Sequence, residues 1–193
     1  KCDWSSDVCS SDLAQNTVGV QAIHAVPPPF LKAQLQTVIE DIGVDAVKIG
    51  MLHEPGVVEV VAWAIEHYQL RHVVFDPVMV ATSGDRLIEH DTVRLLVDRL
   101  FPLASVITPN LDEASLLLER EIKSVEGLPQ AAHALLEQGA QAVLLKGGHL
   151  SGDDVVDVLA RHGHADVMLA SRRIASRNTH GTGCTLSSAV RSE

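Results

Sequence analysis

Several features are scarce in this sequence, and each absence excludes a class of protein. Three cysteines in 193 residues are too few for a disulfide framework, so we expect a reducing, cytoplasmic setting. No apolar run reaches the roughly 18 residues of a membrane-spanning helix. Lys and Arg (15) are outnumbered by Asp and Glu (25), for a formal net charge of −10. This charge argues against nucleic-acid and anionic-membrane partners, and it leaves open a local positive pocket for a small anion.

Internal repeats and low-complexity linkers are also missing, so we expect one domain. The ten histidines show no zinc-ligand spacing, and we expect most of them at the surface. The chain is rich in hydrophobic residues, at 46 %. That share excludes a disordered chain and allows a sizeable core at this length.

The two ends of the chain differ from the sequence between them. Residues 1–13 (KCDWSSDVCSSDL) are rich in Ser and Asp, lack periodicity and are too polar for a signal peptide. The string DWSSDVCSSDL resembles one reading frame of a common sequencing adapter, and residues 191–193 (RSE) resemble the same adapter read from the other side. We therefore expect assembly scars at 1–13 and 191–193 around a partial domain over 14–190. A natural polar tail is the alternative, and resequencing the source DNA decides between them.

Apolar periodicity predicts helices that alternate with short strands. Helical spacing is found over residues 27–43, 54–70, 111–119 and 127–139, and around Leu95, Leu96 and Leu100. Short apolar strands are predicted within residues 44–49, 71–76, 105–110 and 141–149, followed by a hairpin over 154–160 and 165–170. This alternation implies an α/β fold with a mostly parallel sheet covered by helices on both faces.

Polar residues follow three of the predicted strands. Asp76 follows VVF, residues 108–110 follow SVI, and residues 146–149 follow AVLL. Ligands of open α/β sheets bind beyond the carboxyl ends of the strands. We therefore expect these polar residues to lie at one edge of the sheet and to form a binding site.

The stretch NTHGTGCTLSSAV (residues 178–190) contains Cys184, the only cysteine outside the first thirteen residues. Gly181 and Gly183 allow a sharp turn and a close approach to a ligand. A helix that follows would direct unpaired N–H groups at a phosphate and would lower the pKa of Cys184. The alternative is a glycine-rich turn into a core helix with an inert cysteine.

Individual residues near the strand ends suit nucleotide and metal chemistry. Lys146 can reach a phosphate as a point charge, or it is a surface lysine before a tight turn. Asp76 can hold Mg²⁺ through water, or it is a turn residue before Pro77. Asn110 and Glu113 match a capping box, which leaves a role for Glu113 near metal-bound phosphate open.

Three weaker signals complete the candidate residues. Gln15 offers a donor and an acceptor to the edge of a heterocycle. Met51 is either a pliable apolar contact or part of the core. Residues 82–87 (TSGDRL) are typical of a flexible loop or lid, and His53, His149 and His180 lie near strand ends.

Taken together, AQNTVGV, KIGML, DPVM, SGDRL, ITPNLDEA, LLKGGH and NTHGTGCTLS resemble, in order and spacing, the hydroxymethylpyrimidine/phosphomethylpyrimidine kinases of thiamine biosynthesis. These enzymes have a ribokinase-like fold, and the resemblance covers residues 14–190. It implies ATP-dependent phosphorylation of 4-amino-5-hydroxymethyl-2-methylpyrimidine and then of its monophosphate. It also implies Mg²⁺ as the metal and a homodimer at full length.

The resemblance also implies roles for particular residues. It places the pyrimidine beside Gln15 and Met51. It places the Mg²⁺–phosphate cluster beside Asp76 and Glu113, and nucleotide contacts at Lys146, Asn110 and Thr179. The anion hole would comprise Gly181, Thr182, Gly183 and Cys184, with Cys184 as the base that takes the hydroxyl proton.

Two parts of the family pattern are missing: the first strand with its Gly-rich turn, and the C-terminal helices on the adenine side. We therefore expect the 193-residue chain to be unstable and inactive by itself. Three alternatives stay open: a pyridoxal kinase-like enzyme of the same fold, a cysteine hydrolase that uses Cys184 with His180, and a non-catalytic pyrimidine-binding protein.

Overall fold

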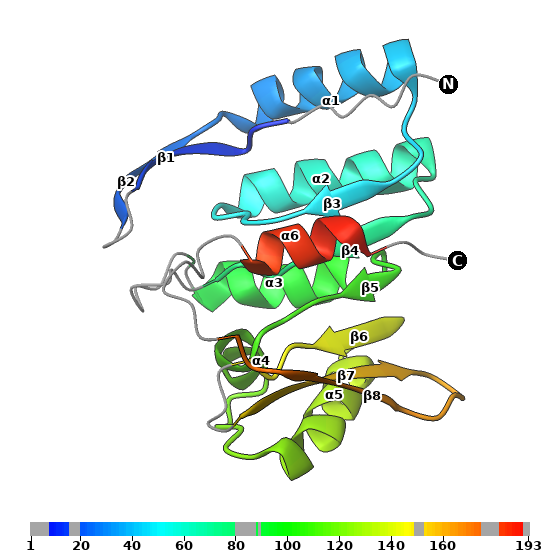
Figure 1. Cartoon of the computed structure of the whole chain (residues 1–193). Helices are drawn as coiled ribbons and strands as arrows, with labels where there is room; N and C mark the ends of the chain where they lie inside the picture. Colours follow the sequence, from blue (N-terminus) through cyan, green and yellow to red (C-terminus); the bar gives the residue numbers. More distant parts are fainter. Residues whose placement is uncertain are drawn as a thin grey trace.

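Strands and helices alternate along the chain and form a six-stranded sheet in the order β3-β4-β5-β6-β7-β8 (Figure 1). A computed structural model describes residues 8–15, 20–79, 88, 90–148, 153–174 and 182–190. The strands are β3 (Val47–Ile49), β4 (Val73–Phe75), β5 (Val106–Ile107), β6 (Ala142–Leu145), β7 (Asp154–Arg161) and β8 (Val167–Arg172). The first four are parallel, whereas β7 and β8 are antiparallel to their neighbours.

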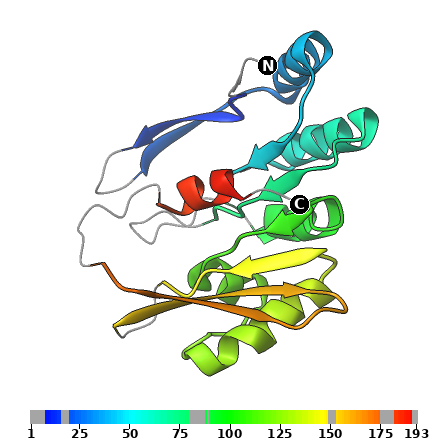
Figure 2. The same ribbon diagram turned by 45° about the vertical axis from the view of Figure 1, so that its right-hand side comes forward.

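The helices divide unevenly between the two faces of the sheet. They are α1 (Pro28–Ile42), α2 (Pro55–Tyr68), α3 (His90–Leu100), α4 (Leu111–Leu117), a 3₁₀ turn η1 (Val125–Gly127), α5 (Leu128–Glu137) and α6 (Thr182–Ala189). Helices α2, α3 and α5 cover one face and α6 lies on the other (Figure 2). The predicted α/β fold with helices on both faces is confirmed, and α6 is the described helix on the second face.

The main core lies between the sheet and the layer of α2, α3 and α5. Strand β4 is buried along its whole length, because both of its faces are covered, as is typical of parallel strands. Phe75 on β4 meets Phe101 edge to face, with ring centroids 6.2 Å apart. On the opposite face Val74 and Val106 form a smaller cluster against which Val190 packs. Successive side chains of β4 therefore contribute to two separate apolar layers, one on each face of the sheet.

A second, two-stranded sheet is formed by β1 (Ser11–Gln15) and β2 (Val20–Ala25), which pair antiparallel near α1 (Figure 1). The sequence pattern did not predict this hairpin, because the apolar residues of its strands do not alternate regularly with polar ones, and most of its residues are exposed. The hydroxyl of Ser10 donates to the carbonyl of Met51 over 3.1 Å and ties the hairpin to the end of β3. The domain boundary expected at residue 14 falls inside β1. That residues 1–13 are an assembly scar stays a prediction, which DNA sequencing can test.

Helix ends follow local sequence signals where such signals exist. Proline lies in the first turn of α1, α2 and α5, where its missing N–H costs nothing. The residue after α2, Gln69, adopts a left-handed conformation (φ 52°) and ends the helix. Within the described residues, the helices are all too short or too polar to traverse a bilayer.

Candidate active site

Asp76 lies at the centre of the candidate site, directly after β4. Its backbone N–H donates to the carbonyl of Ile49 over 2.9 Å, which extends the pairing of β4 with β3 by one residue. The side chain is only 2 % exposed. Because β4 lies between β3 and β5, Asp76 is placed where side chains from both neighbouring strands can reach it. A buried carboxylate in this position needs compensating charge and hydrogen bonds.

Four side chains surround the Asp76 carboxylate, from β3, from the residues that follow β5 and β6, and from α6. Oδ1 accepts from Lys146 Nζ at 2.9 Å and from Thr108 Oγ1 at 3.1 Å. Oδ2 accepts from Ser187 Oγ at 3.3 Å and lies 3.8 Å from Lys48 Nζ. We call these five residues the Asp76 cluster. The structure thus brings together the ends of β4, β5 and β6, as expected from the polar residues that follow these strands.

Lys146 connects the sheet edge to the start of α6. Its backbone N–H donates to Pro109 over 2.9 Å, and Asn110 and Lys146 form an isolated parallel bridge. A Cβ placed on Gly183 would lie 3.2 Å from Lys146 Nζ, so the ammonium group lies against the first turn of α6. A lysine and the N–H groups of a helix start are therefore adjacent, which is an arrangement that attracts phosphate.

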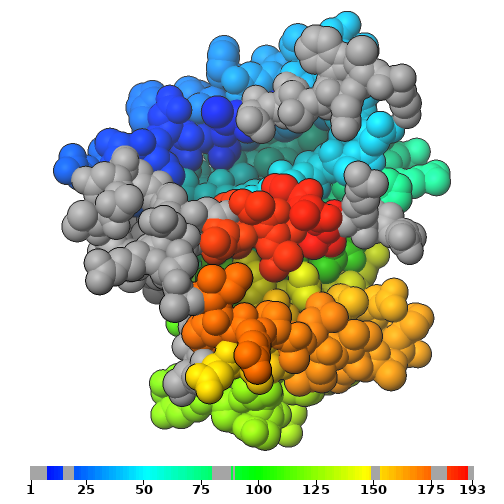
Figure 3. All heavy atoms as spheres, in the orientation of Figure 1, coloured from blue at the N-terminus to red at the C-terminus, as the bar shows by residue number. Residues whose placement is uncertain are grey.

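Helix α6 begins at Thr182 and carries Cys184 in its first turn, exposed to solvent. Ser187 is 1 % exposed, and its single O–H lies within hydrogen-bonding distance of both Asp76 Oδ2 (3.3 Å) and the carbonyl of Cys184 (3.0 Å). Ser188 donates to the same carbonyl over 2.8 Å. In the space-filling view α6 lies at the surface, with the strands of the β7–β8 hairpin beside it (Figure 3). One side of α6 is therefore anchored to Asp76 while Cys184 stays accessible.

Asn110 and Glu113 form the predicted capping box at the start of α4. The Asn110 side chain accepts from the Glu113 N–H at 2.9 Å, and Glu113 Oε2 accepts from the Asn110 N–H at 2.7 Å. Glu113 is 3 % exposed. Burial raises the pKa of Glu113 to about 7, the nearby Asp76 charge adds to this, and the bond from Asn110 and the Lys146 charge oppose it. Glu113 therefore lies within the electrostatic field of the Asp76 cluster.

The residues expected at the pyrimidine lie at the hairpin side of the molecule. Met51 follows β3, is partly buried and accepts the hydrogen bond from Ser10. Gln15 is the last residue of β1, opposite Val20, and its side chain is outside the described part. Thr179, His180, Gly181, His149 and the 82–87 loop also lie outside the described residues. Their expected roles stay predictions.

Two members of the Asp76 cluster were missed by sequence reasoning. Lys48 lies in β3, which the pattern presented simply as a short apolar strand. A lysine inside such a strand, two residues before Gly50, was the available signal. Ser187 gave a weaker signal in the sequence, because small polar residues are common inside helices. Neither partner of Asp76 is visible without the spatial arrangement of β3, β4 and α6.

A metal ion would find two acidic side chains in this region. In the described part of the chain, His, Cys, Asp and Glu form no group of three or more suited to a metal. Mg²⁺ requires less, because it keeps several waters and binds through one or two carboxylates together with substrate phosphates. Asp76 and Glu113, which interact electrostatically, fit that requirement.

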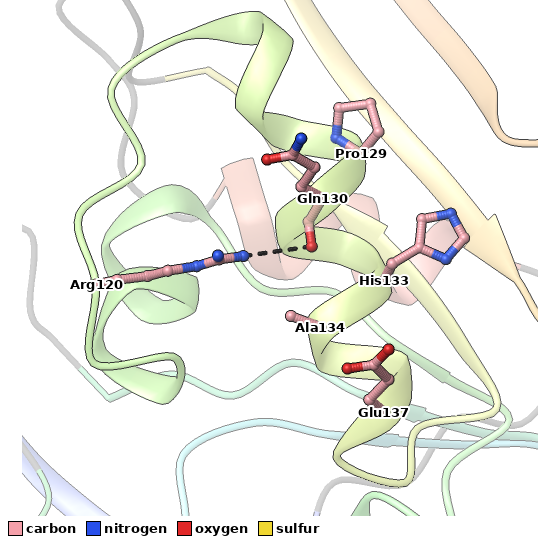
Figure 4. A pocket seen from close by; sticks show the side chains of 6 residues that line it. All are labelled: Arg120, Pro129, Gln130, His133, Ala134 and Glu137. Carbon is pink, nitrogen blue, oxygen red and sulfur yellow. Dashed lines mark hydrogen bonds between the residues drawn. The ribbon is translucent and has the colours of Figure 1, made fainter.

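A surface groove of about 450 Å³ lies elsewhere, along α5 (Figure 4). Six residues line it, namely Arg120, Pro129, Gln130, His133, Ala134 and Glu137. Arg120 Nη2 donates to the Gln130 carbonyl over 3.3 Å, and His133 pairs with Asp166 at 3.0 Å. The groove shares no residue with the Asp76 cluster, and Arg120 and His133 already have partners.

The fold and the strand-end cluster define a ribokinase-like α/β protein. A crystal structure of phosphomethylpyrimidine kinase from Clostridium difficile is similar, with a TM-score of 0.77, 30 % identity and coverage of 97 % of this chain and 80 % of that chain. An ADP complex of Bacillus subtilis pyridoxal kinase gives a TM-score of 0.82 and 38 % identity over 93 % of this chain and 67 % of that one.

The family model for phosphomethylpyrimidine kinase matches residues 6–193, and the chain belongs to this family. The thiamine biosynthesis bifunctional protein ThiED of Geobacter sulfurreducens is 48 % identical over 97 % of the chain. The hydroxymethylpyrimidine/phosphomethylpyrimidine kinase of Escherichia coli is 43 % identical over 97 % of it. The chain spans 38 % of the length of the first relative and 70 % of the second.

Proposed function

We propose that this protein is a kinase that transfers the γ-phosphoryl group of ATP to 4-amino-5-hydroxymethyl-2-methylpyrimidine and then to its monophosphate, in thiamine diphosphate biosynthesis. The family and the names of its relatives support this substrate class. The observation that carries the proposal is Lys146, which is bound to buried Asp76 and lies against the first turn of α6. Phosphoryl transfer depends mainly on such positioning and on charge stabilisation.

The candidate residues divide this work between them. Lys146 supplies a positive charge to the nucleotide phosphates, with contributions from Asn110 and Thr179. The N–H groups at Thr182 and Gly183, together with Gly181, stabilise the charge that develops on the transferred phosphoryl group. Cys184, exposed on the same turn, takes the proton of the substrate hydroxyl as transfer proceeds. Gln15 and Met51 contact the pyrimidine.

The proposed metal is Mg²⁺, held near Asp76 and Glu113. Bound there, Mg²⁺ would neutralise part of the negative charge of the phosphate groups. Asp76 already accepts from Lys146, Thr108 and Ser187. Because its oxygens are engaged with protein donors, Asp76 fits a contact through a water molecule better than a direct bond to the metal.

Pyridoxal kinase activity is the second candidate. It is favoured by the structural similarity to the Bacillus subtilis pyridoxal kinase at 38 % identity. An assay that couples ADP release to NADH oxidation, run with the pyrimidine alcohol and with pyridoxal, separates the two. We expect the higher kcat/KM for the pyrimidine alcohol, and a preference for pyridoxal would reverse the proposal.

The role of Cys184 is tested with the product of the complete gene. Replacing Cys184 with Ala removes the proton acceptor, so turnover should fall by about 100-fold or more. The KM for Mg·ATP should change by less than about threefold, because the thiol contacts the acceptor substrate and not the nucleotide. Ser188→Ala, at an exposed position of the same helix, is the matched control. Unchanged turnover of the Cys184→Ala variant would exclude the base role.

We further propose that the complete protein is cytoplasmic and homodimeric and that the 193-residue chain alone is inactive. The small number of cysteines supports the cytoplasmic location, and the family resemblance supports the homodimer. Size-exclusion chromatography with light scattering tests the dimer. The same ADP-release assay, applied to both lengths of the protein, tests whether the shorter chain turns over substrate.

A further inference from the structure

Two lysines flank one buried carboxylate in the Asp76 cluster. Lys146 Nζ binds Oδ1 at 2.9 Å, and Lys48 Nζ lies 3.8 Å from Oδ2, on the opposite oxygen. The side chains of Lys146 and Lys48 are 13 % and 25 % exposed, compared with 2 % for Asp76. Asp76 therefore has two cationic neighbours, of which the proposed function uses only Lys146.

The position of Lys48 depends on the glycine that follows its strand. A Cβ placed on Gly50 would lie 3.2 Å from Lys48 Nζ, which is tighter than ordinary van der Waals contact. Without that carbon, the ammonium group lies over the backbone of the turn after β3 and points toward Asp76. Lys146 uses Gly183 in the same way on the other side. Both ammonium groups thus occupy space that a missing side chain leaves open.

Lys146 cannot serve Asp76 and a nucleotide phosphate equally well. A lysine that turns toward a phosphate weakens its bond to Asp76, and a buried carboxylate that loses its partner charge is strongly destabilised. Thr108 and Ser187 donate hydrogen bonds but carry no charge. Among the described residues, Lys48 is the second positive charge beside Asp76, and it lies near the oxygen that Lys146 does not contact.

We propose that Lys48 is a positioning residue that keeps Asp76 charge-compensated when Lys146 turns toward the nucleotide phosphate. It acts through Asp76 and Lys146 and not by contacting the nucleotide. This inference rests on the proposed function, in which Lys146 binds phosphate. Lys48 lowers the free-energy cost of moving Lys146 away from Asp76. Nucleotide affinity therefore depends on a residue of β3, the strand beside β4.

The test measures ADP binding by isothermal titration calorimetry on the product of the complete gene, in EDTA and again with Mg²⁺. Lys48→Met should weaken ADP binding in EDTA by about tenfold, the size of a typical coupling between contacting charges. Lys48→Arg should stay within about threefold of the wild type, since it keeps the charge. Lys123→Met, at an exposed lysine paired with Glu121, is the control and should bind as the wild type does.

A double-mutant cycle separates positioning from direct contact. In an Asp76→Asn background no buried charge is left to compensate, so adding Lys48→Met should change ADP affinity by less than about twofold. An equal loss in both backgrounds would mean that Lys48 contacts the nucleotide itself and would overturn the proposal. Wild-type affinity of the Lys48→Met single variant would overturn it too. Melting temperatures of all variants show whether each one is folded.

The outcomes also separate this inference from the proposed function. If the wild type binds ADP but phosphorylates neither alcohol, the proposed substrate is wrong and the Lys48 cycle still decides the inference. If the wild type phosphorylates the pyrimidine and Lys48→Met binds ADP normally, only the inference fails. If the wild type binds no ADP, both are overturned.

Discussion

At the scale of single residues, burial changes the chemistry of the acidic side chains most. Asp76 and Glu113 are both almost fully buried, at 2 % and 3 % exposure, yet their partners differ. Asp76 is surrounded by two lysines and two hydroxyls. Glu113 receives a hydrogen bond from the backbone N–H of Asn110 and lies near the negative charge of Asp76. The two carboxyls of the site are therefore held in different electrostatic environments.

The raised pKa of Glu113 predicts a pH-dependent stability. Burial raises this pKa from 4.5 to about 7 in the folded protein. Between these values the folded state holds a proton that the unfolded state has released, so stability falls as pH rises from 4.5 to 7. The loss is on the order of 3 kcal/mol at most, and it should be complete above pH 7.

Urea unfolding at several pH values, without Mg²⁺ or nucleotide, measures this loss. Glu113→Gln keeps an acceptor for the Asn110 N–H but does not titrate, so its stability should change less between pH 4.5 and 7. Glu137→Gln, at an exposed position of α5, is the matched control and should follow the wild type. Identical pH profiles for wild type and Glu113→Gln would show that Glu113 titrates normally.

At the scale of elements, the ends of strands and helices place the site. The turn after β5 contains the capping box that starts α4, and the bridge between Asn110 and Lys146 joins this turn to the end of β6. The turn after β6 passes very close to β7, where Gly147 N–H donates to Asp157 Oδ1 over 2.9 Å. Two local devices thus fix the backbone on either side of Lys146.

Removal of the helix cap should destabilise the protein. Asn110→Ala deletes the acceptor of the Glu113 N–H, and loss of such a cap costs about 1 kcal/mol. Asn110→Ser and Asn110→Asp, which keep a side-chain oxygen acceptor, should recover most of that loss. Chemical denaturation at constant pH measures the three variants. Equal stability of Asn110→Ala and wild type would show that α4 needs no cap.

A side chain at residue 147 should disrupt the sheet. A Cβ on Gly147 would lie 2.0 Å from the carbonyl oxygen of Val156, and this clash is with backbone, which cannot move aside as a flexible side chain can. Gly147→Ala should therefore cost about 3 kcal/mol or more. Gly127→Ala is the control, because its Cβ would meet its nearest neighbour at 3.9 Å. Thermal unfolding compares them, and equal melting temperatures would contradict the close approach.

At the scale of the whole molecule, the described parts of the two faces of the sheet differ in coverage. The face under α2, α3 and α5 contains the larger core, with Leu135 and Leu145 fully buried. The other face is covered by α6, and β8 is exposed along its whole length. Stability should therefore depend mainly on the layer under α2, α3 and α5.

Two leucine replacements test this asymmetry. Leu145→Ala leaves a cavity at a fully buried position of β6 and should cost about 2–5 kcal/mol. Leu169→Ala, at a β8 position that is 47 % exposed, should cost less than about 1 kcal/mol. Urea denaturation of both variants gives the comparison. A large loss for Leu169→Ala would mean that something covers β8 in solution.

Much of the fold was predictable because its signals are local. Helical periodicity located α1, α2 and α5, apolar runs located β4 and β6, and the Asn110–Glu113 spacing predicted the capping box. The β1–β2 hairpin was not predicted, since the apolar residues of its mostly exposed strands do not alternate regularly with polar ones. The β7–β8 hairpin was predicted and is confirmed, but its antiparallel pairing with β6 in the main sheet was not predicted.

The sequence by itself determined which polar residues follow the strands, because parallel strands place their carboxyl ends at one edge of a sheet. Only the tertiary structure decided their partners. Lys48 and Ser187 are 28 and 111 residues from Asp76 along the chain, and only the packing of β3 and α6 around β4 brings them within 4 Å of its carboxylate. Contacts between residues so far apart in the sequence depend on the whole fold, and local patterns of residues therefore do not predict them.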